Sequence, residues 1–179
     1  MPTKTIWESE GKTPAGDPFL TVKQARGYYY YAERGGMDSV FFILYDRTTC
    51  KFAIINESKP PLDERLKEEA SMATAFGGSI DSDLPFEEIV RTEVLEEAGY
   101  TAELTRIKYV GQTMVSTQMS QIAHGYLVDI TGVTKTNDTE YELAGKGSRT
   151  TWLSMEELIS NSDWKSMFIL LKSQEQGLL

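Results

Sequence analysis

The sequence predicts an α+β fold in which strands and helices are mixed along the chain. Apolar or aromatic runs of strand length recur in both halves, and about three segments carry helical signals. These two kinds of segment do not alternate as regular βαβ units, which argues against a doubly wound parallel sheet. The length of 179 residues suits one domain. We therefore expect a single domain over residues 1–179, with residues 1–35 as an N-terminal extension containing strands.

Composition narrows the class of protein. The net charge is −9, and such an acidic surface disfavours nucleic acid and anionic lipid as partners. No apolar run reaches the ~18 residues of a membrane span, and the N-terminus lacks the apolar stretch of a secretory signal. The single cysteine, Cys50, cannot form an internal disulfide. We expect a cytoplasmic protein without a membrane or nucleic-acid partner.

The first half of the chain is mainly of strand type. Residues 1–18 contain three prolines and are expected to be loosely structured or a peripheral extension. The apolar residues 39–45 predict a buried central strand, which a turn at residues 46–49 joins to the next strand. Residues 62–70 fit a short helix or a loop. The expected strands of this half are residues 28–31, 39–45, 52–55 and 71–76, the last ending at Gly77-Gly78.

The second half contains the helices. Before residues 85–98, Ser82 or Asp83 is a potential cap, and Gly99 is expected to end the helix. Ser154 and Glu157 form a capping box that opens a short helix. A last helix is expected over residues 163–173, with Trp164, Phe168, Leu170 and Leu171 on an apolar side. Further strands are expected within residues 100–115, 121–130 and 150–153.

The helix at residues 85–98 places acids where apolar residues are expected. Phe86, Ile89 and Val90 define an apolar stripe at ~100° per residue, and Glu93 and Glu97 continue it. Partly buried carboxylates are costly unless they are paired, so a hard cation such as Mg²⁺ or Mn²⁺ is a natural partner. Periodicity alone supports an exposed acidic patch equally well.

The complete string over residues 78–100, GSIDSDLPFEEIVRTEVLEEAGY, decides between these alternatives. It resembles the Nudix box, a loop–helix–loop pattern of Gly, five residues, Glu, seven residues and then Arg-Glu-apolar-x-Glu-Glu-x-Gly-apolar. The positions that match are Gly78, Glu93, Val94, Glu96, Glu97, Gly99 and Tyr100.

Two positions depart from the box, since Leu84 replaces its first Glu and Thr92 replaces its Arg. In the family these two side chains usually form a salt bridge that braces the box. Losing both together leaves no orphan charge. An i,i+4 pair of Glu87 and Arg91 is a potential substitute, and Arg91 is alternatively placed to reach the loop.

The resemblance implies the Nudix fold, an α/β/α sandwich with a central mixed β-sheet. It also implies metal-dependent hydrolysis of a phosphoanhydride bond in a nucleoside diphosphate linked to another group. Glu93 and Glu97 would bind Mg²⁺ or Mn²⁺ together with the carbonyl oxygen of Gly77. Glu96 would bind a second metal ion or orient the attacking water.

The rest of the site is less defined by the resemblance. A general base often lies on a later loop, where Glu140 and Glu142 are the candidates, although a solvated acidic loop is the simpler interpretation. The layout loosely resembles ADP-ribose and ADP-sugar pyrophosphatases, which favours such substrates weakly and suggests a homodimer. Arg26 and Lys59 are candidates for phosphate contacts. Tyr28 is a candidate for stacking on a base, although an aromatic strand more often lies in a core.

Two alternatives remain at this stage. Leu84 and Thr92 favour an inactive Nudix-fold module that binds a nucleotide or regulates another protein. An isomerase on the same fold would need Cys50 in its pocket, and the expected turn position of Cys50 opposes this. His124, the only histidine, is expected to be a partly buried structural residue.

Overall fold

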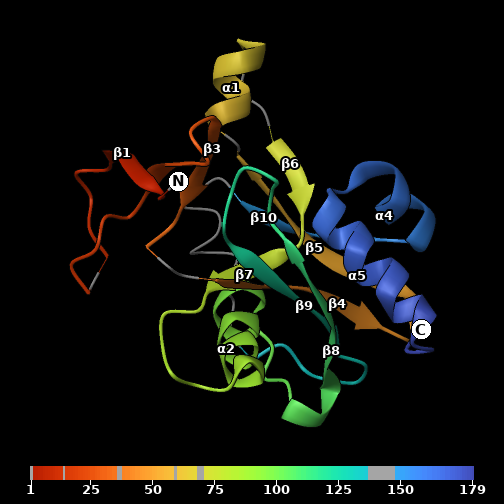
Figure 1. The fold of residues 1–179 in the computed structure, drawn as a ribbon. Helices are drawn as coiled ribbons and strands as arrows, with labels where there is room; N and C mark the ends of the chain where they lie inside the picture. Colours follow the sequence, from red (N-terminus) through yellow and green to blue (C-terminus); the bar gives the residue numbers. More distant parts are fainter. Residues whose placement is uncertain (1, 14, 36–37, 59, 68–70, 137–147) are drawn as a thin grey trace.

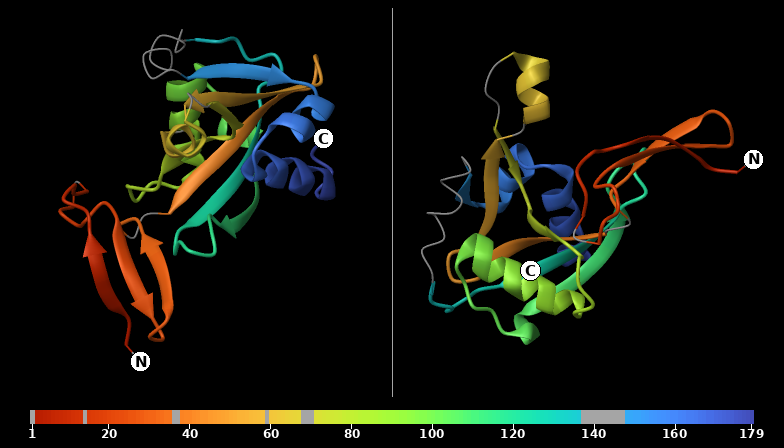
Figure 2. Two further views of the ribbon diagram at one scale, coloured as in Figure 1. Left: turned by 90° about the horizontal axis from the view of Figure 1, so that it is seen from above. Right: turned by 90° about the vertical axis from the view of Figure 1, so that its left-hand side faces the viewer.

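The computed structural model contains two β-sheets (Figure 1). It describes residues 2–13, 15–35, 38–58, 60–67, 71–136 and 148–179. The smaller sheet is antiparallel and joins β1 (Lys4–Glu8), β2 (Thr21–Ala25) and β3 (Tyr29–Glu33). It extends away from the rest of the molecule (Figure 2).

The larger sheet is mixed and has seven strands. Its main path runs β10-β5-β4-β9-β8, and β6 pairs with β5 while β7 pairs with β4. The pairing of β4 with β9 is parallel, and the other pairings are antiparallel. The strands are β4 (Ser39–Asp46), β5 (Lys51–Ser58), β6 (Ser71–Thr74), β7 (Phe76–Ser79), β8 (Ile107–Met114), β9 (Ile122–Asp129) and β10 (Arg149–Leu153).

Helices cover both faces of the larger sheet. One face carries α2 (Phe86–Glu93) and the π-helical turn η1 (Val94–Ala98) that continues it. The other face carries α5 (Trp164–Glu175), with α4 (Met155–Asn161) beside it. The helix α1 (Pro60–Leu66) lies at the margin of the molecule, and the 3-10 turn η2 (Leu104–Arg106) precedes β8 (Figure 1). The predicted α+β fold, an α/β/α sandwich with a central mixed sheet, is confirmed.

The central strand β4 shows why two helical layers are needed. Side chains of a strand alternate between its two faces, so a strand that is apolar throughout must be covered on both. Val40, Phe42 and Leu44 pack in the cluster that contains the buried residues of α2. Phe41 and Ile43 pack in the cluster that contains the buried residues of α4 and α5. All five are at most 2% exposed.

The larger sheet divides beside β4, and this division creates the site. β4 pairs with β5 only over Leu44–Asp46, and over Ser39–Phe42 it pairs with β7 instead. Beyond the division, β5 pairs with β6. The chain crosses from β5 to β4 at Ala75, between β6 and β7. The backbone of β7 is therefore brought between the two diverging strands, next to α2.

In the N-terminal region one expectation was met and one was wrong. Of the two alternatives for residues 1–18, the structure supports the peripheral extension, because Lys4–Glu8 forms β1 and pairs with β2 in the small sheet. The tyrosines at positions 28, 29 and 30 do not enter a core, since their exposed fractions are 70%, 41% and 52%. No helix of the described residues lies on the small sheet (Figure 2), and every residue of β1 is exposed.

Three helix and strand details also differ from expectation. The first helical residue of α2 follows Pro85, and no side chain caps it, so Ser82 and Asp83 are not caps. The predicted strand at residues 71–76 is two strands, and Gly77 and Gly78 lie within the second. On α5, Leu171 is 57% exposed and Trp164 is 43% exposed, while Ile169 and Leu170 form the buried side.

Two expectations about local structure were met. The capping box of Ser154 and Glu157 opens α4. Gly99 ends η1 with a φ of 78°, a left-handed conformation that glycine adopts without strain. None of the helices in the described ranges is long and apolar enough to cross a membrane.

Candidate active site

The helix of the box orients its acids toward the divided sheet. Ile89, Val90 and Val94 are buried against the sheet and fix the rotation of the helix. Glu93 and Glu97 are half-buried at the edge of this face, whereas Glu96 is exposed. The apolar stripe thus places two of the three predicted metal ligands next to β7.

Both half-buried carboxylates contact the glycine pair of β7. The Gly77 N–H donates a hydrogen bond to Oε2 of Glu97 at 3.1 Å. A Cβ atom at position 78 would lie 1.9 Å from Oε1 of Glu93, so the Glu93 carboxylate occupies space that any other residue would fill. Only glycine at position 78 permits this approach.

This arrangement is electrostatically unfavourable for Glu93. Burial raises the pKa of its carboxyl group, and the nearby charges of Glu96 and Asp81 raise that pKa further. A cation placed between these acids would offset both effects. The protein therefore holds a carboxylate in a position that costs free energy unless positive charge is supplied.

The donor set fits a hard divalent cation. Carboxylate oxygens are the ligands that Mg²⁺ prefers, and the missing side chain at Gly78 leaves the Glu93 carboxylate directly against the backbone. Within the described ranges, no three Asp, Glu, His or Cys side chains are already gathered at metal-binding distance. Mg²⁺ commonly uses one or two carboxylates and completes its shell with water and substrate phosphate oxygens.

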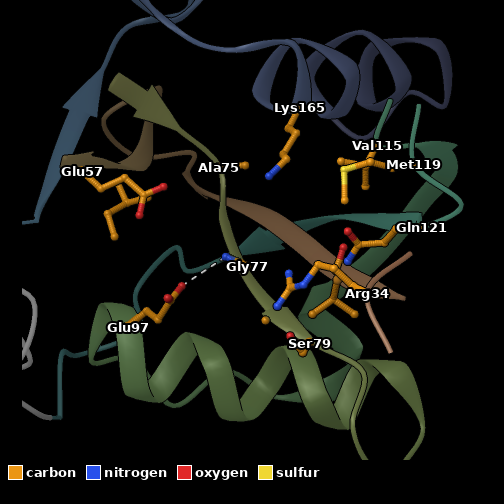
Figure 3. A pocket seen from close by; sticks show the side chains of 14 residues that line it. Arg34, Glu57, Ala75, Gly77, Ser79, Glu97, Val115, Met119, Gln121 and Lys165 are labelled. Carbon is orange, nitrogen blue, oxygen red and sulfur yellow. Dashed lines mark hydrogen bonds between the residues drawn. The ribbon is translucent and has the colours of Figure 1, made fainter. Parts of the chain in front are cut away.

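A cavity of about 470 Å³ opens beside these glycines (Figure 3). Glu97 lies on the α2 side, and β7 passes along the wall. Arg34 and Lys165 point into the cavity from different elements. The lining residues are Arg34, Ser39, Val40, Ile55, Glu57, Ala75, Gly77, Gly78, Ser79, Glu97, Val115, Met119, Gln121 and Lys165.

Several polar lining residues were not found from the sequence. Arg34 follows β3, Glu57 lies near the end of β5, Gln121 precedes β9, and Lys165 lies in the first turn of α5. These four positions are far apart in the chain and form no spaced motif. The available signal is weak: Lys165 is a cation at the positive end of a helix dipole, which is an unfavourable place for it.

Some predicted site residues do not reach this cavity. Arg26 and Tyr28 lie at the turn between β2 and β3, and neither belongs to the cavity lining. Tyr28 is 70% exposed there. Lys59, Glu140 and Glu142 lie outside the described residues.

The two residues considered for other chemistry have structural positions. Cys50 is exposed in the turn between β4 and β5 and does not line the cavity. His124 is 9% exposed and lies between the rings of Phe86 and Tyr109, with centroid distances of 4.7 and 6.3 Å. The expectation of a structural histidine is met, and an isomerase based on Cys50 has no support.

The two departures from the box face solvent. Leu84 is 54% exposed, and the Thr92 hydroxyl donates to the Glu88 carbonyl oxygen of its own helix at 3.1 Å. Arg91 pairs with Glu88 at 2.6 Å, so the expected pair with Glu87 was wrong. Partners three residues apart are also adjacent on a helix, and an exposed pair of this kind stabilises it only slightly.

Comparison with known proteins connects this geometry to a known fold. No family model matches the sequence, and no curated protein matches it. Among solved structures, one described as the crystal structure of ADP compounds hydrolase superposes with a TM-score of 0.67 and 13% sequence identity. The match covers 100% of this chain and 95% of that chain. The chain therefore shares the overall fold of that hydrolase.

Proposed function

We propose that this protein hydrolyses a phosphoanhydride bond in a nucleoside diphosphate linked to another group, with Mg²⁺ or Mn²⁺ as cofactor. One observation carries the proposal. Glu97 accepts the Gly77 N–H and Glu93 lies against the bare backbone of Gly78, at the edge of a cavity large enough for a nucleotide portion. If the acids of this helix faced solvent, no glycine would be required at position 78.

Each residue has a definite task in this proposal. Glu93 and Glu97 would hold the metal ion together with the carbonyl oxygen of Gly77, and the exposed Glu96 would bind a second metal ion or orient the attacking water. The ion supplies Lewis-acid polarisation of the phosphoryl oxygens and a lowered pKa for bound water. The hydrogen bond from Gly77 fixes the Glu97 carboxylate, so that little reorganisation is needed during the reaction.

The general base and the substrate class are further parts of the proposal. Glu140 and Glu142, which follow β9 in the sequence and lie outside the described residues, are the candidate bases. The superposed structure is described as an ADP compounds hydrolase, which supports testing adenosine diphosphate compounds first. Tyr28, Arg26 and Lys59 are secondary candidates for substrate contacts.

The test is hydrolysis of a panel of compounds with Mg²⁺ or Mn²⁺: ADP-ribose, ADP-glucose, NADH, dinucleoside polyphosphates and nucleoside triphosphates. Glu97→Gln is the test variant, and Glu156→Gln, an exposed acid in the first turn of α4, is the control. We expect metal-dependent turnover that falls ~100-fold or more in Glu97→Gln, because a metal ligand supplies several kcal/mol to the transition state. The control should retain the activity of the unchanged protein.

Folded protein that binds a nucleotide but hydrolyses nothing would contradict the proposal. That result would instead favour the inactive binding or regulatory module. Turnover that Glu97→Gln leaves intact would contradict the assigned site. A variant with Glu140 and Glu142 both changed to Gln tests the base separately, and a loss of turnover with retained metal binding is the expected result.

A further inference from the structure

Arg34 and Lys165 enter the cavity from opposite ends of the sequence. Arg34 follows the small N-terminal sheet, and Lys165 belongs to the last helix (Figure 3). Neither residue belongs to the Nudix-like box or to the site residues that were predicted from the sequence. Their presence in one cavity is created entirely by the tertiary structure.

Lys165 is held in place by the anchoring of α5. Asp163 caps this helix by accepting the Ser166 N–H at 3.0 Å, and its other oxygen accepts the Thr74 hydroxyl at 2.6 Å. The Asp163 N–H also donates to the carbonyl oxygen of Ala73 at 3.1 Å. The first turn of α5 is thereby fixed to β6, directly beside the crossing at Ala75 that borders the cavity.

Lys165 has no compensating partner in the described part of the chain. No hydrogen bond or ion pair joins its amine to another described residue, and its side chain is half-buried. A cation in the first turn also opposes the helix dipole. Together the amine and the positive end of α5 produce a local positive potential on a protein whose net charge is −9.

Arg34 is anchored in a different way. Its guanidinium carbon lies 4.8 Å from the centre of the Phe19 ring. The preceding strand is fixed by hydrogen bonds between Ala32 and the segment at residues 118–120. The Nε atom of Arg34 is buried and has no hydrogen-bond partner among the described residues. A buried donor without an acceptor is costly, and the guanidinium end of the same side chain points into the cavity, where it is available to an anion (Figure 3).

We propose that Arg34 and Lys165 form an anion subsite that binds the phosphate groups of the substrate from two sides. This inference rests on the proposed function and adds the residues that bind the diphosphate independently of metal. The two acids and two bases lining the cavity cancel in charge. In Figure 3, Arg34 and Lys165 lie on one side of β7, and Glu57 and Glu97 lie on the other. One region therefore suits phosphate oxygens, and the other suits the cation. The guanidinium suits bidentate contact with phosphate, and the ammonium acts as a point charge.

The experiment measures binding without catalysis. The affinities of ADP, inorganic pyrophosphate and adenosine are determined by calorimetry in the presence of a chelator. The test variants are Arg34→Ala and Lys165→Ala. The control is Lys172→Ala, which removes an exposed lysine of the same helix that pairs with Glu175. Thermal unfolding of each variant confirms that it is folded.

We expect each test variant to weaken ADP and pyrophosphate binding ~10-fold or more, because charge-assisted hydrogen bonds to phosphate are lost. Adenosine binding should not change, and Lys172→Ala should match the unchanged protein. Lys165→Arg should restore part of the affinity, since it keeps the charge. In the hydrolysis assay, the loss should appear mainly in KM if the contacts hold ground and transition states equally.

Three results would overturn the inference: no binding of either phosphate-bearing probe by the unchanged protein, unchanged affinity in both alanine variants, or an equal loss for adenosine. The proposed function fails separately. If no compound is hydrolysed but ADP binding without metal still depends on Arg34 and Lys165, the anion subsite is supported and the proposed reaction is refuted. If hydrolysis depends on Glu97 but the affinity for ADP does not depend on Arg34 or Lys165, the proposed reaction is supported and the anion subsite is refuted.

Discussion

The substitution Gly78→Ala tests whether the position of the Glu93 carboxylate affects metal-dependent turnover separately from the stability of the fold. The new Cβ would lie 1.9 Å from Oε1, 2.3 Å from Cδ and 2.8 Å from Cγ of Glu93. Contacts of a real Cβ essentially never fall below 3.0 Å, so the Glu93 carboxylate must withdraw by about 1 Å or more. All three of the nearest atoms belong to this one flexible side chain.

The size of each effect follows from that geometry. Because a side-chain end can rotate away, the cost in stability is small, and the lower entropy of the unfolded alanine chain offsets part of it. We expect the Tm to change by no more than about 3 °C, corresponding to about 1 kcal/mol for a chain of this size. A displacement of about 1 Å at a reacting site costs ~100-fold in rate. Metal-dependent turnover should therefore fall ~100-fold while the protein stays folded.

The assay is a double-mutant cycle with Gly78→Ala, Glu93→Gln and the combined variant, using turnover and Mn²⁺ affinity as readouts. If Gly78 acts by making room for the Glu93 carboxylate, the alanine adds almost no further loss once Glu93 is changed. Gly11→Ala is the matched control, since a Cβ there meets no atom within 4 Å. Full additivity, or an active Gly78→Ala protein, would refute this role for Gly78.

Three further predictions concern stability. In the presence of a chelator, Glu93→Gln should be more stable than the unchanged protein at neutral pH. Burial raises the pKa of Glu93 in the folded state, so the unchanged protein loses stability as the pH rises from ~4.5 through that raised pKa. Thermal unfolding measured across this pH range should show the difference, and equal pH profiles for the two proteins would contradict the prediction. Asp163→Ala should lower the free energy of unfolding by about 2 to 3 kcal/mol, because it removes a helix cap and leaves the buried Thr74 hydroxyl without its acceptor. Urea titration measures this free energy, and a loss below ~0.5 kcal/mol would contradict the prediction. Gly99→Ala should cost about 1 to 2 kcal/mol in the same titration because its φ is 78°, and a neutral result would show that the turn relaxes.

The elements with strong local signals were predictable from the sequence. The apolar run of β4 and the Ser154–Glu157 capping box determine their own structures through burial and local hydrogen bonds. The left-handed end at Gly99 belongs to the same group. Apolar periodicity also placed Glu93 and Glu97 at the inner edge of their helix, because the rotation of an amphipathic helix is set by its buried side.

Other features depended on contacts between distant segments. The exposure of the tyrosines at positions 28–30 could not be predicted, because nothing in a strand sequence says whether a helix will cover it. The division of the strand at residues 71–79 depends on where β4 and β5 diverge, which is a property of the assembled sheet. The choice of Glu88 as the partner of Arg91 reflects two equally adjacent helix positions.

The sequence by itself determined the α+β fold class, the rotation of the box helix and the acids that it presents, because these follow from periodicity and spacing within single segments. The tertiary structure decided that Gly78 makes room for Glu93 and that Gly77 holds Glu97. It also decided that Arg34 and Lys165 share one cavity. The physical reason is that these contacts join elements whose separation in space is set by sheet pairing and core packing, which no local pattern encodes.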